Sequence, residues 1–210
     1  MGLTSVSFGG RISKFFNAWV GITSNLNILE LIKGVPLELN DIPNQKTAGR
    51  QYKFDSCTKN LMDTEITIFV ELGIIEKSNH EEDEVISSIF CGKKKSGNIR
   101  LIGNFKDINA DIKCHKFKQT TVQEVLDLIS PGGYMCSIDL KDAYYCINVR
   151  EDYRKFLKFT WDNELYQFRT LGQGLGCSPR IFTKLMKVPM SFLRTCGIVI
   201  IAYILTIFLS

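Results

Sequence analysis

Acidic and aromatic side chains are concentrated between residues 137 and 145, at the end of an apolar run. Asp139 and Asp142 lie three positions apart, and Tyr144 and Tyr145 follow directly. A carboxylate here can bind a divalent metal ion, or it can cap the turn or helix that begins at residue 140. On the residues alone, a cap is favoured for Asp139 and a solvated turn for Asp142.

A glycine-rich segment and a cationic helix face lie further along the chain. The segment Gly172–Gly176 alternates glycine with other residues, but it lacks the strand and helix context of a dinucleotide-binding fingerprint. Ser178 as N-cap and Pro179 as first residue then predict a helix over 179–193, with its apolar residues on one face. The opposite face carries three cations, Arg180, Lys184 and Lys187. This stripe is either a solvated surface or a phosphate contact.

Positive charge is local in this chain. The net charge of the 210 residues is only +4, yet residues 93–118 carry eight Lys or Arg against two Asp. Strands are predicted at 85–91 and 98–102, and the turn Lys93–Gly97 joins them through a glycine that permits positive φ. The sequence therefore predicts a basic hairpin that can mark a binding surface.

Two amphipathic helices are predicted before the acidic segment. Asp63 can cap the first, which Gly73 ends. Its apolar face has three members, Ile66, Phe69 and Val70. A capping box at Thr121–Glu124 begins the second helix, over residues 120–130. Upstream of both, residues 11–45 predict a short helix followed by extended chain.

Strand patterns complete the predicted fold. One strand is expected at 134–140, and a hairpin at 156–161 and 164–168 around Asp162-Asn163. With the helices at 120–130 and 179–193, these strands predict an α+β fold with a mainly antiparallel sheet backed by helices.

Composition limits the setting of the protein. The chain is 45% hydrophobic, which is typical of a globular protein. Its seven cysteines are odd in number and include no C-x-x-C pair, which indicates a reduced, intracellular protein without a zinc cluster. The N-terminus shows no secretory signal. Residues 197–210 carry no charge but are shorter than the ~20 residues of a membrane-spanning helix. They predict a buried strand pair, and no stable membrane association is expected.

The order of the motifs resembles the fingers and palm of a retrotransposon reverse transcriptase, closest to the DIRS-like and Ty3-like kinds. The segments that carry the resemblance are Ile99–Asn109, Ser137–Tyr144 and Tyr166–Lys184. Several ordered motifs are more specific than any single one. The resemblance implies a lead-in segment at 1–50 and a reverse transcriptase domain at 51–210, truncated before the thumb. The implied fingers are approximately 51–119 and 147–175, and the implied palm, incomplete, is approximately 120–146 and 176–210.

The resemblance also implies roles for single residues. Asp139 matches the family's first metal-binding aspartate, a catalytic ligand of Mg²⁺, whereas Asp142 is not a ligand. Tyr144 matches the aromatic residue beneath the sugar of the incoming nucleotide, which selects deoxynucleotides. Triphosphate contacts are implied for Arg100 and for a lysine among Lys93, Lys94 and Lys95. Gln173 and Gly174 match the loop beside the template base.

The chain departs from the family at its last motif. Tyr203–Thr206 aligns with the family's aromatic-x-Asp-Asp hairpin, but Leu205 and Thr206 stand where the two aspartates belong. One carboxylate cannot fix two Mg²⁺ ions. We therefore expect an RNA-directed DNA polymerase by ancestry, acting on RNA or DNA template–primer and deoxynucleotides, whose activity is lost in this copy. The alternative is a non-catalytic nucleic-acid-binding remnant. Further polymerase or RNase H segments of a parent polyprotein are expected partners.

Overall fold

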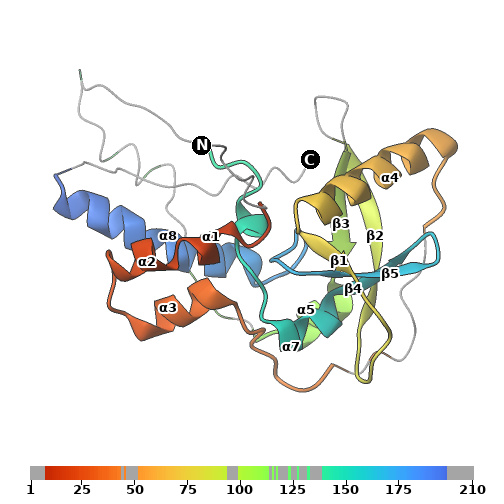
Figure 1. The fold of residues 1–210 in the computed structure, drawn as a ribbon, viewed down its shortest axis with the longest axis horizontal. Helices are drawn as coiled ribbons and strands as arrows, with labels where there is room; N and C mark the ends of the chain where they lie inside the picture. The colour runs from red at the N-terminus through yellow and green to blue at the C-terminus, as the bar shows by residue number, and fades with distance from the viewer. Residues whose placement is uncertain are drawn as a thin grey trace, which may run out of the picture.

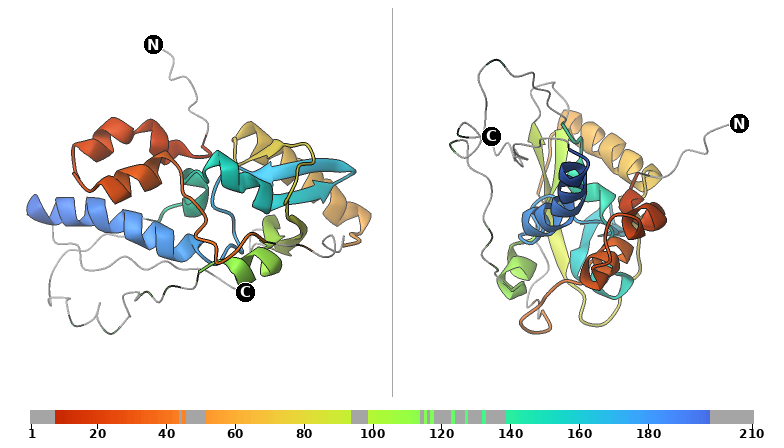
Figure 2. Two further views of the ribbon diagram at one scale, coloured as in Figure 1. Left: turned by 90° about the horizontal axis from the view of Figure 1, so that it is seen from below. Right: turned by 90° about the vertical axis from the view of Figure 1, so that its left-hand side faces the viewer.

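The structure of the chain is a computed structural model, and it describes residues 8–43, 45, 52–93, 99–113, 115, 117, 123, 127, 132 and 139–197. Within these residues the larger elements lie on two sides of the molecule (Figure 1, Figure 2). One side holds four helices, α1 (Arg11–Lys14), α2 (Phe16–Val20), α3 (Leu26–Lys33) and α8 (Ser178–Thr195). The other side holds α4 (Ser56–Glu71) and a five-stranded sheet.

The sheet has the strand order β1-β5-β4-β2-β3. Its strands are β1 (Ile75–Lys77), β2 (Ile86–Lys93), β3 (Ile99–Asn104), β4 (Lys158–Trp161) and β5 (Glu164–Phe168). Neighbouring strands are antiparallel, except that β2 runs parallel to β4 and pairs with it at Ile86–Lys158 and Ser87–Phe159. The described sheet is therefore mixed, and its strands come from residues 75–104 and 158–168, within the two segments expected to form the fingers.

The two predicted hairpins are confirmed, with shifted bounds. β2 and β3 pair from Ser88–Asn104 to Lys93–Ile99, so Lys93 belongs to the strand and not to the turn. β4 and β5 meet at a turn in which Asp162 has φ 49° and Asn163 has φ 64°. Asp and Asn tolerate this left-handed conformation, which matches the twist of a two-residue hairpin. β4 begins only at Lys158, because residues 155–157 form the 3₁₀ turn η2 (Lys155–Leu157).

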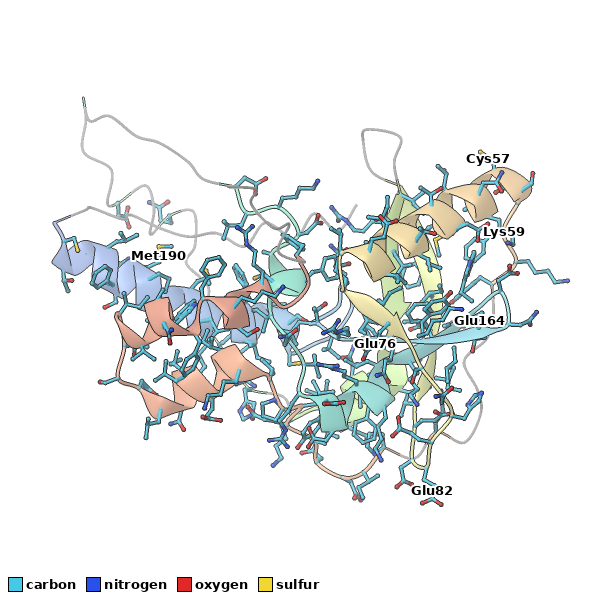
Figure 3. The ribbon with its side chains drawn as sticks, in the orientation of Figure 1. Cys57, Lys59, Glu76, Glu82, Glu164 and Met190 are labelled. Atoms are coloured by element: carbon cyan, nitrogen blue, oxygen red, sulfur yellow. The ribbon has the colours of Figure 1, made fainter. Side chains whose placement is uncertain are left out.

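The predicted cap of α4 is wrong. Asp55 is the N-cap, and its Oδ1 accepts the Thr58 N–H at 2.9 Å. Asp63 lies inside the helix instead, where its Oδ1 accepts the Trp161 Nε1–H at 2.8 Å. Lys59 joins this contact from the preceding turn, 3.2 Å from Asp63, and its side chain points toward the β4–β5 turn (Figure 3). Asp63, which the sequence predicts as a helix cap, therefore links α4 to β4 of the sheet instead.

The buried face of α4 also differs from the prediction at one position. Met62, Ile66 and Phe69 are buried, at the i, i+4, i+7 spacing of one helix face. Val70 is 41% exposed, since it lies about 100° further round the helix than Phe69. Sequence spacing gives Ile66 and Phe69 correctly but cannot show where the buried stripe ends.

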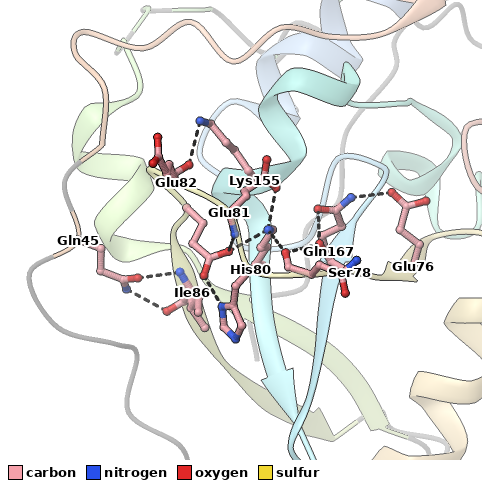
Figure 4. Close-up of polar contacts among 12 residues, drawn as sticks. Gln45, Glu76, Ser78, His80, Glu81, Glu82, Ile86, Lys155 and Gln167 are labelled. Carbon is pink, nitrogen blue, oxygen red and sulfur yellow. Dashed lines mark hydrogen bonds and ion pairs between the residues drawn. The ribbon is translucent and has the colours of Figure 1, made fainter.

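The N-terminal segment has three short helices in place of the single predicted one. Buried side chains from this segment join the same hydrophobic cluster as the sheet and α8; they include Ile12, Trp19, Ile28, Ile32, Val35 and Leu37. Further on, the Gln45 side chain bonds both backbone groups of Ile86, accepting from its N–H at 2.7 Å and donating to its carbonyl at 2.9 Å (Figure 4). The described residues of this segment, 8–43 and 45, therefore pack onto the rest of the structure.

Helix α8 begins one residue earlier than predicted. Cys177 is the N-cap, so Ser178 and Pro179 are its first two residues, and the Ser178 hydroxyl donates to the Gly172 carbonyl at 3.0 Å. Its apolar face packs inward as predicted, and Lys184 and Lys187 are exposed on the other side.

Several predicted elements lie largely outside the described residues, namely the turn at 93–97 after its first residue, the strand at 134–140 before residue 139, and the apolar stretch at 197–210 after its first residue. Of the predicted helix at 120–130, only residues 123 and 127 are described, and the Asp127 N–H donates to the Gln123 carbonyl at 3.0 Å, as in one turn of α-helix. Among the described helices, none combines the length and apolar character needed to cross a bilayer.

Lys158 is a buried charge that the sequence did not indicate. Its side chain is fully buried, and its ammonium contacts Asn79 O at 2.6 Å, Glu81 Oε1 at 2.7 Å and Glu84 Oε2 at 2.8 Å. The acidic segment before β2 is thereby folded against β4; the neighbouring contacts of His80 and Glu81 are shown in Figure 4. Three oxygens match the three hydrogens of the ammonium, as burial of this charge requires.

Candidate functional site

Asp139 is exposed and lies just before the 3₁₀ helix η1 (Ala143–Cys146). The N-cap of η1 is Asp142, in the left-handed conformation with φ 52°, so Asp139 does not cap this helix. Asp142 itself makes no side-chain cap hydrogen bond. Asp139 is thus left exposed at the surface.

The residues of the predicted metal motif do not fit a centre of two metal ions. Within the described part of the chain, no group of three or more His, Cys, Asp or Glu side chains is placed to hold a metal ion. The partners of Asp139 in the sequence motif would be Leu205 and Thr206, which lie outside the described residues and offer one neutral oxygen between them. Mg²⁺ requires near-octahedral oxygen coordination, and a pair of such ions requires several anionic ligands.

Tyr144 is fixed by a contact with α8. Its ring meets that of Phe182 edge to face, with 5.8 Å between the ring centroids. Its hydroxyl is buried and has no hydrogen-bond partner among the described residues, and burial raises the pKa of Tyr144 to about 12. Tyr144 is therefore neutral at physiological pH, and its ring is held in place against α8.

Tyr145 is part of the core and connects η1 electrostatically to β3. Its ring is 2% exposed and lies 5.1 Å from that of Phe69. Burial is the main cause that raises the pKa of Tyr145; the charge of Asp142 raises it further, and the charge of Arg100 lowers it. Arg100 of β3 therefore lies close enough to η1 for its charge to be felt there.

The loop 172–176 approaches the other end of β3. Gly174 has φ 97°, and a Cβ added at this residue would lie 2.3 Å from the carbonyl oxygen of Gly103. Only glycine permits both the conformation and the contact. Gln173 is half-buried and Gly174 is exposed. The structure therefore brings the predicted loop and the strand that carries Arg100 side by side.

A side chain that the sequence analysis did not single out holds this loop. Asn109, on α5 (Lys106–Asp111), hydrogen-bonds the backbone at Gly174 and Gly176. The residue is the last of the Ile99–Asn109 segment that carries the resemblance, but its contact spans 65 residues. Sequence spacing gives no signal for such a pairing.

The predicted lysine cluster is described only at its first member. Lys93 pairs with Ile99 at the end of β2, and Lys94 and Lys95 lie outside the described residues. Their roles at a triphosphate therefore stay predictions.

The cationic stripe of α8 is divided by an ion pair. Lys184 and Lys187 are exposed, whereas Arg180 Nη2 lies 3.0 Å from Glu38 Oε1. The other oxygen of Glu38 contacts His115 Nε2 at 2.5 Å. Burial alone would raise the pKa of Glu38, but hydrogen bonds from Arg180 and His115 outweigh it and lower that pKa below its usual 4.5. Arg180 is therefore engaged by the N-terminal segment, and two lysines remain exposed.

We expect the Glu38 contacts to make stability depend on pH. Because the folded-state pKa is lowered, the stabilisation is complete above the unfolded value of 4.5 and is lost as the pH falls toward the folded value. Glu38→Gln should therefore unfold more easily than wild type at pH 7, and the difference should shrink as the pH falls below 4.5 and through the lowered folded-state pKa. Urea denaturation at several pH values measures this. A difference that does not change with pH would contradict the ion pairing.

A cavity of about 280 Å³ lies elsewhere, between β2, the β4–β5 hairpin and α4. Its wall includes Tyr52, Phe54, Lys59, Ser87 and Trp161, and none of the predicted site residues lines it. The candidate site residues that the structure describes lie instead on β3, on η1 and just before it, in the 172–176 loop and on α8.

Comparison with known proteins gives the class of this chain. A family model described as "Reverse transcriptase (RNA-dependent DNA polymerase)" matches residues 92–205, more than half of the sequence. The chain therefore belongs to the reverse transcriptase family.

Relatives extend this match to retroelement polyproteins. The transposon Tf2-3 polyprotein of Schizosaccharomyces pombe is 24% identical over 178 residues, which cover 82% of this chain and 13% of the polyprotein. The putative enzymatic polyprotein of Cassava vein mosaic virus is 30% identical over 117 residues, covering 54% of this chain and 18% of the polyprotein. The predicted relationship to retrotransposon reverse transcriptases is confirmed. The chain spans less than a fifth of these relatives.

Solved structures share the fold. The foamy viral protease-reverse transcriptase dRH, in complex with double-stranded DNA, has a TM-score of 0.63 and 16% identity, covering 95% of this chain and 38% of that chain. A second structure, of the foamy viral protease-reverse transcriptase in complex with dsDNA, also has a TM-score of 0.63 and 16% identity, covering 88% of this chain and 42% of that chain. The predicted α+β reverse-transcriptase-type fold is confirmed, and it covers part of such an enzyme.

Proposed function

We propose that this chain is the reverse transcriptase segment of a retroelement polyprotein, and that its surface beside β3 receives a template–primer and an incoming deoxynucleotide. The observation that carries the proposal is the close approach of Gly174 to Gly103, because it sets the Gln173–Gly174 loop against the strand that carries Arg100. Membership in the family supports the same assignment. The boundaries of fingers and palm given above are part of this proposal.

Each proposed contact has a chemical reason. The guanidinium of Arg100 has the forked geometry that suits phosphate oxygens, and a lysine of the 93–95 group would add a point charge. The neutral ring of Tyr144 would exclude a 2′-hydroxyl sterically. Gln173 and Gly174 offer a backbone that a template base can approach closely. Lys184 and Lys187 would contact backbone phosphates, with a smaller contribution from the engaged Arg180.

We also infer that this copy does not polymerise. Asp139 is the one residue of the predicted metal motif that can act as an anionic ligand, because Leu205 and Thr206 replace the aspartates. Where the family uses Mg²⁺ to lower the barrier to phosphoryl transfer, this chain lacks the ligands for two such ions. The protein would then bind nucleic acid without extending it, as the non-catalytic alternative states.

Nucleic-acid binding and primer extension test the two parts separately. Purified protein should bind a labelled template–primer with an affinity that falls as salt rises, and Lys184→Ala/Lys187→Ala should reduce the slope of log K against log salt by up to about 0.9 per lost phosphate contact. Lys77→Ala, which removes an exposed lysine paired with Glu164 on β1, is the matched control.

The outcomes distinguish the alternatives. We expect no deoxynucleotide incorporation above background. Incorporation by wild type that disappears in Asp139→Ala would show that the enzyme is active and that the inactivity proposal is wrong. Absence of any template–primer binding would refute the binding proposal.

The polyprotein context is also proposed. The curated relatives are polyproteins of which this chain matches only a small part, which supports further polymerase or RNase H segments as partners. The five described cysteines are free, which supports an intracellular setting. Peptide mass spectrometry of a size-separated cell extract would test whether these residues occur within a longer product.

A further inference from the structure

We infer that Asn109 is the positioning residue of the Gln173–Gly174 loop and thereby sets the protein's preference for an unpaired template strand; this inference rests on the proposed function. Asn109 Nδ2–H donates to the Gly174 carbonyl at 2.8 Å, and Asn109 Oδ1 accepts the Gly176 N–H at 2.7 Å. One amide therefore binds two backbone groups on either side of Leu175. No other described side chain bonds the loop backbone in this two-point manner.

An asparagine is specifically suited to this position. Its amide presents one donor and one acceptor side by side, and the loop presents one carbonyl and one N–H. An aspartate would keep the bond to Gly176 but place a negative oxygen against the Gly174 carbonyl. An alanine would lose both bonds. The two substitutions therefore remove the contact in graded steps.

The loop needs an external support because its own sequence is permissive. Glycine at 172, 174 and 176 gives a chain with many accessible conformations. At its start, the Gly172 carbonyl accepts the Ser178 hydroxyl at 3.0 Å. At its middle and end, Asn109 supplies side-chain bonds to Gly174 and Gly176, and the Leu175 carbonyl between them accepts the Ser178 N–H at 3.1 Å. The positive φ of Gly174 is thus held from outside the loop.

Asn109 is itself rigidly placed. Its backbone N–H donates to the Phe105 carbonyl at 2.8 Å in α5, and the Phe105 ring is 1% exposed and lies 5.5 Å from that of Phe168 in β5. The Asn109 side chain therefore fixes the loop relative to the core of the sheet. Through it, Gln173 and Gly174 are held beside β3, where a template base would lie.

The test compares two nucleic acids in fluorescence anisotropy titrations at fixed salt. One is a labelled blunt DNA duplex, and the other is the same duplex with a single-stranded 5′ template extension. We expect wild type to bind the extended duplex more tightly. Asn109→Ala should weaken binding of the extended duplex by about fivefold or more, the effect of losing one to two hydrogen bonds, and leave the blunt duplex unchanged. Asn109→Asp should do the same to a smaller or equal extent.

Controls separate positioning from folding. Asn25→Ala removes an asparagine whose side chain caps α3 by accepting the Asn27 N–H at 3.0 Å, on an element that does not carry the loop or β3, and should change neither affinity. Thermal unfolding identifies a variant that does not fold; Asn109→Asp, which keeps one bond, then carries the test. A wild type that binds neither nucleic acid refutes the proposed function and this inference with it. A wild type without preference for the extension, or Asn109 variants that weaken both substrates equally or neither, overturns this inference alone.

Discussion

Replacing Lys158 by methionine should lower the free energy of unfolding by about 3 kcal/mol, because it removes one partner of a buried ion cluster. Glu84 would be left with its side chain 14% exposed and without the ammonium that now lies 2.8 Å away. Glu81 is half exposed and would be solvated more easily. The loss therefore comes mainly from the carboxylate that stays inside. Urea denaturation of the purified variant measures it.

Two further variants make this result specific. Lys77→Met removes an exposed lysine whose partner Glu164 is also exposed, so its cost should be much smaller than that of Lys158→Met. Adding Glu84→Gln to Lys158→Met should recover part of the stability, since an amide tolerates burial better than an unpaired carboxylate. Equal losses for Lys158→Met and Lys77→Met would show that burial of Lys158 is not the cause.

Restoring the missing carboxylates should restore polymerisation. In the double variant Leu205→Asp/Thr206→Asp, primer extension with Mg²⁺ is expected to rise at least about 10²-fold above wild type, the scale at which single electrostatic groups act in active sites. The reason is that the two new carboxylates, together with Asp139, make three, which could hold the ions that one cannot. Incorporation of labelled deoxynucleotide into a primer on an RNA template is the measurement.

The matched control keeps size and polarity but not charge. Leu205→Asn/Thr206→Asn should stay at background, and Asp139→Ala in the restored protein should return it to background. If the restored protein still binds template–primer but incorporates nothing, the lost aspartates are not the reason for inactivity.

Local patterns in the sequence were sufficient for some elements of the fold. The β4–β5 hairpin was predicted because Asp162-Asn163 supplies the left-handed turn, and the buried face of α8 because its apolar spacing is regular. Tertiary pairing decided the rest. Asp55 and Asp63 are equally good caps by type, and only the contact of Asp63 with Trp161 distinguishes them. The parallel pairing of β2 with β4 likewise has no local signal.

The candidate site shows the same division. The resemblance gave the residue types of the site, but the proximity of Arg100 to η1 and of Gly174 to Gly103 depends on chain segments far apart in sequence. The ion pair between Arg180 and Glu38 spans 142 residues and removes one cation from a stripe that helix spacing had predicted as uniform.

The order in which the strands pair has a consequence for synthesis of the protein on the ribosome. β2 can pair with β4 only after the chain has passed residue 161, and β1 acquires its partner β5 later still. The N-terminal segment also cannot complete its contacts until residues 145–149 have been synthesised. Val35 pairs with Val149, and the Gly10 N–H donates to the Tyr145 carbonyl. Contacts of such long sequence separation are slow to form. A nascent chain therefore exposes its apolar N-terminal half until β5 emerges, which makes early termination products natural substrates for chaperones and proteases.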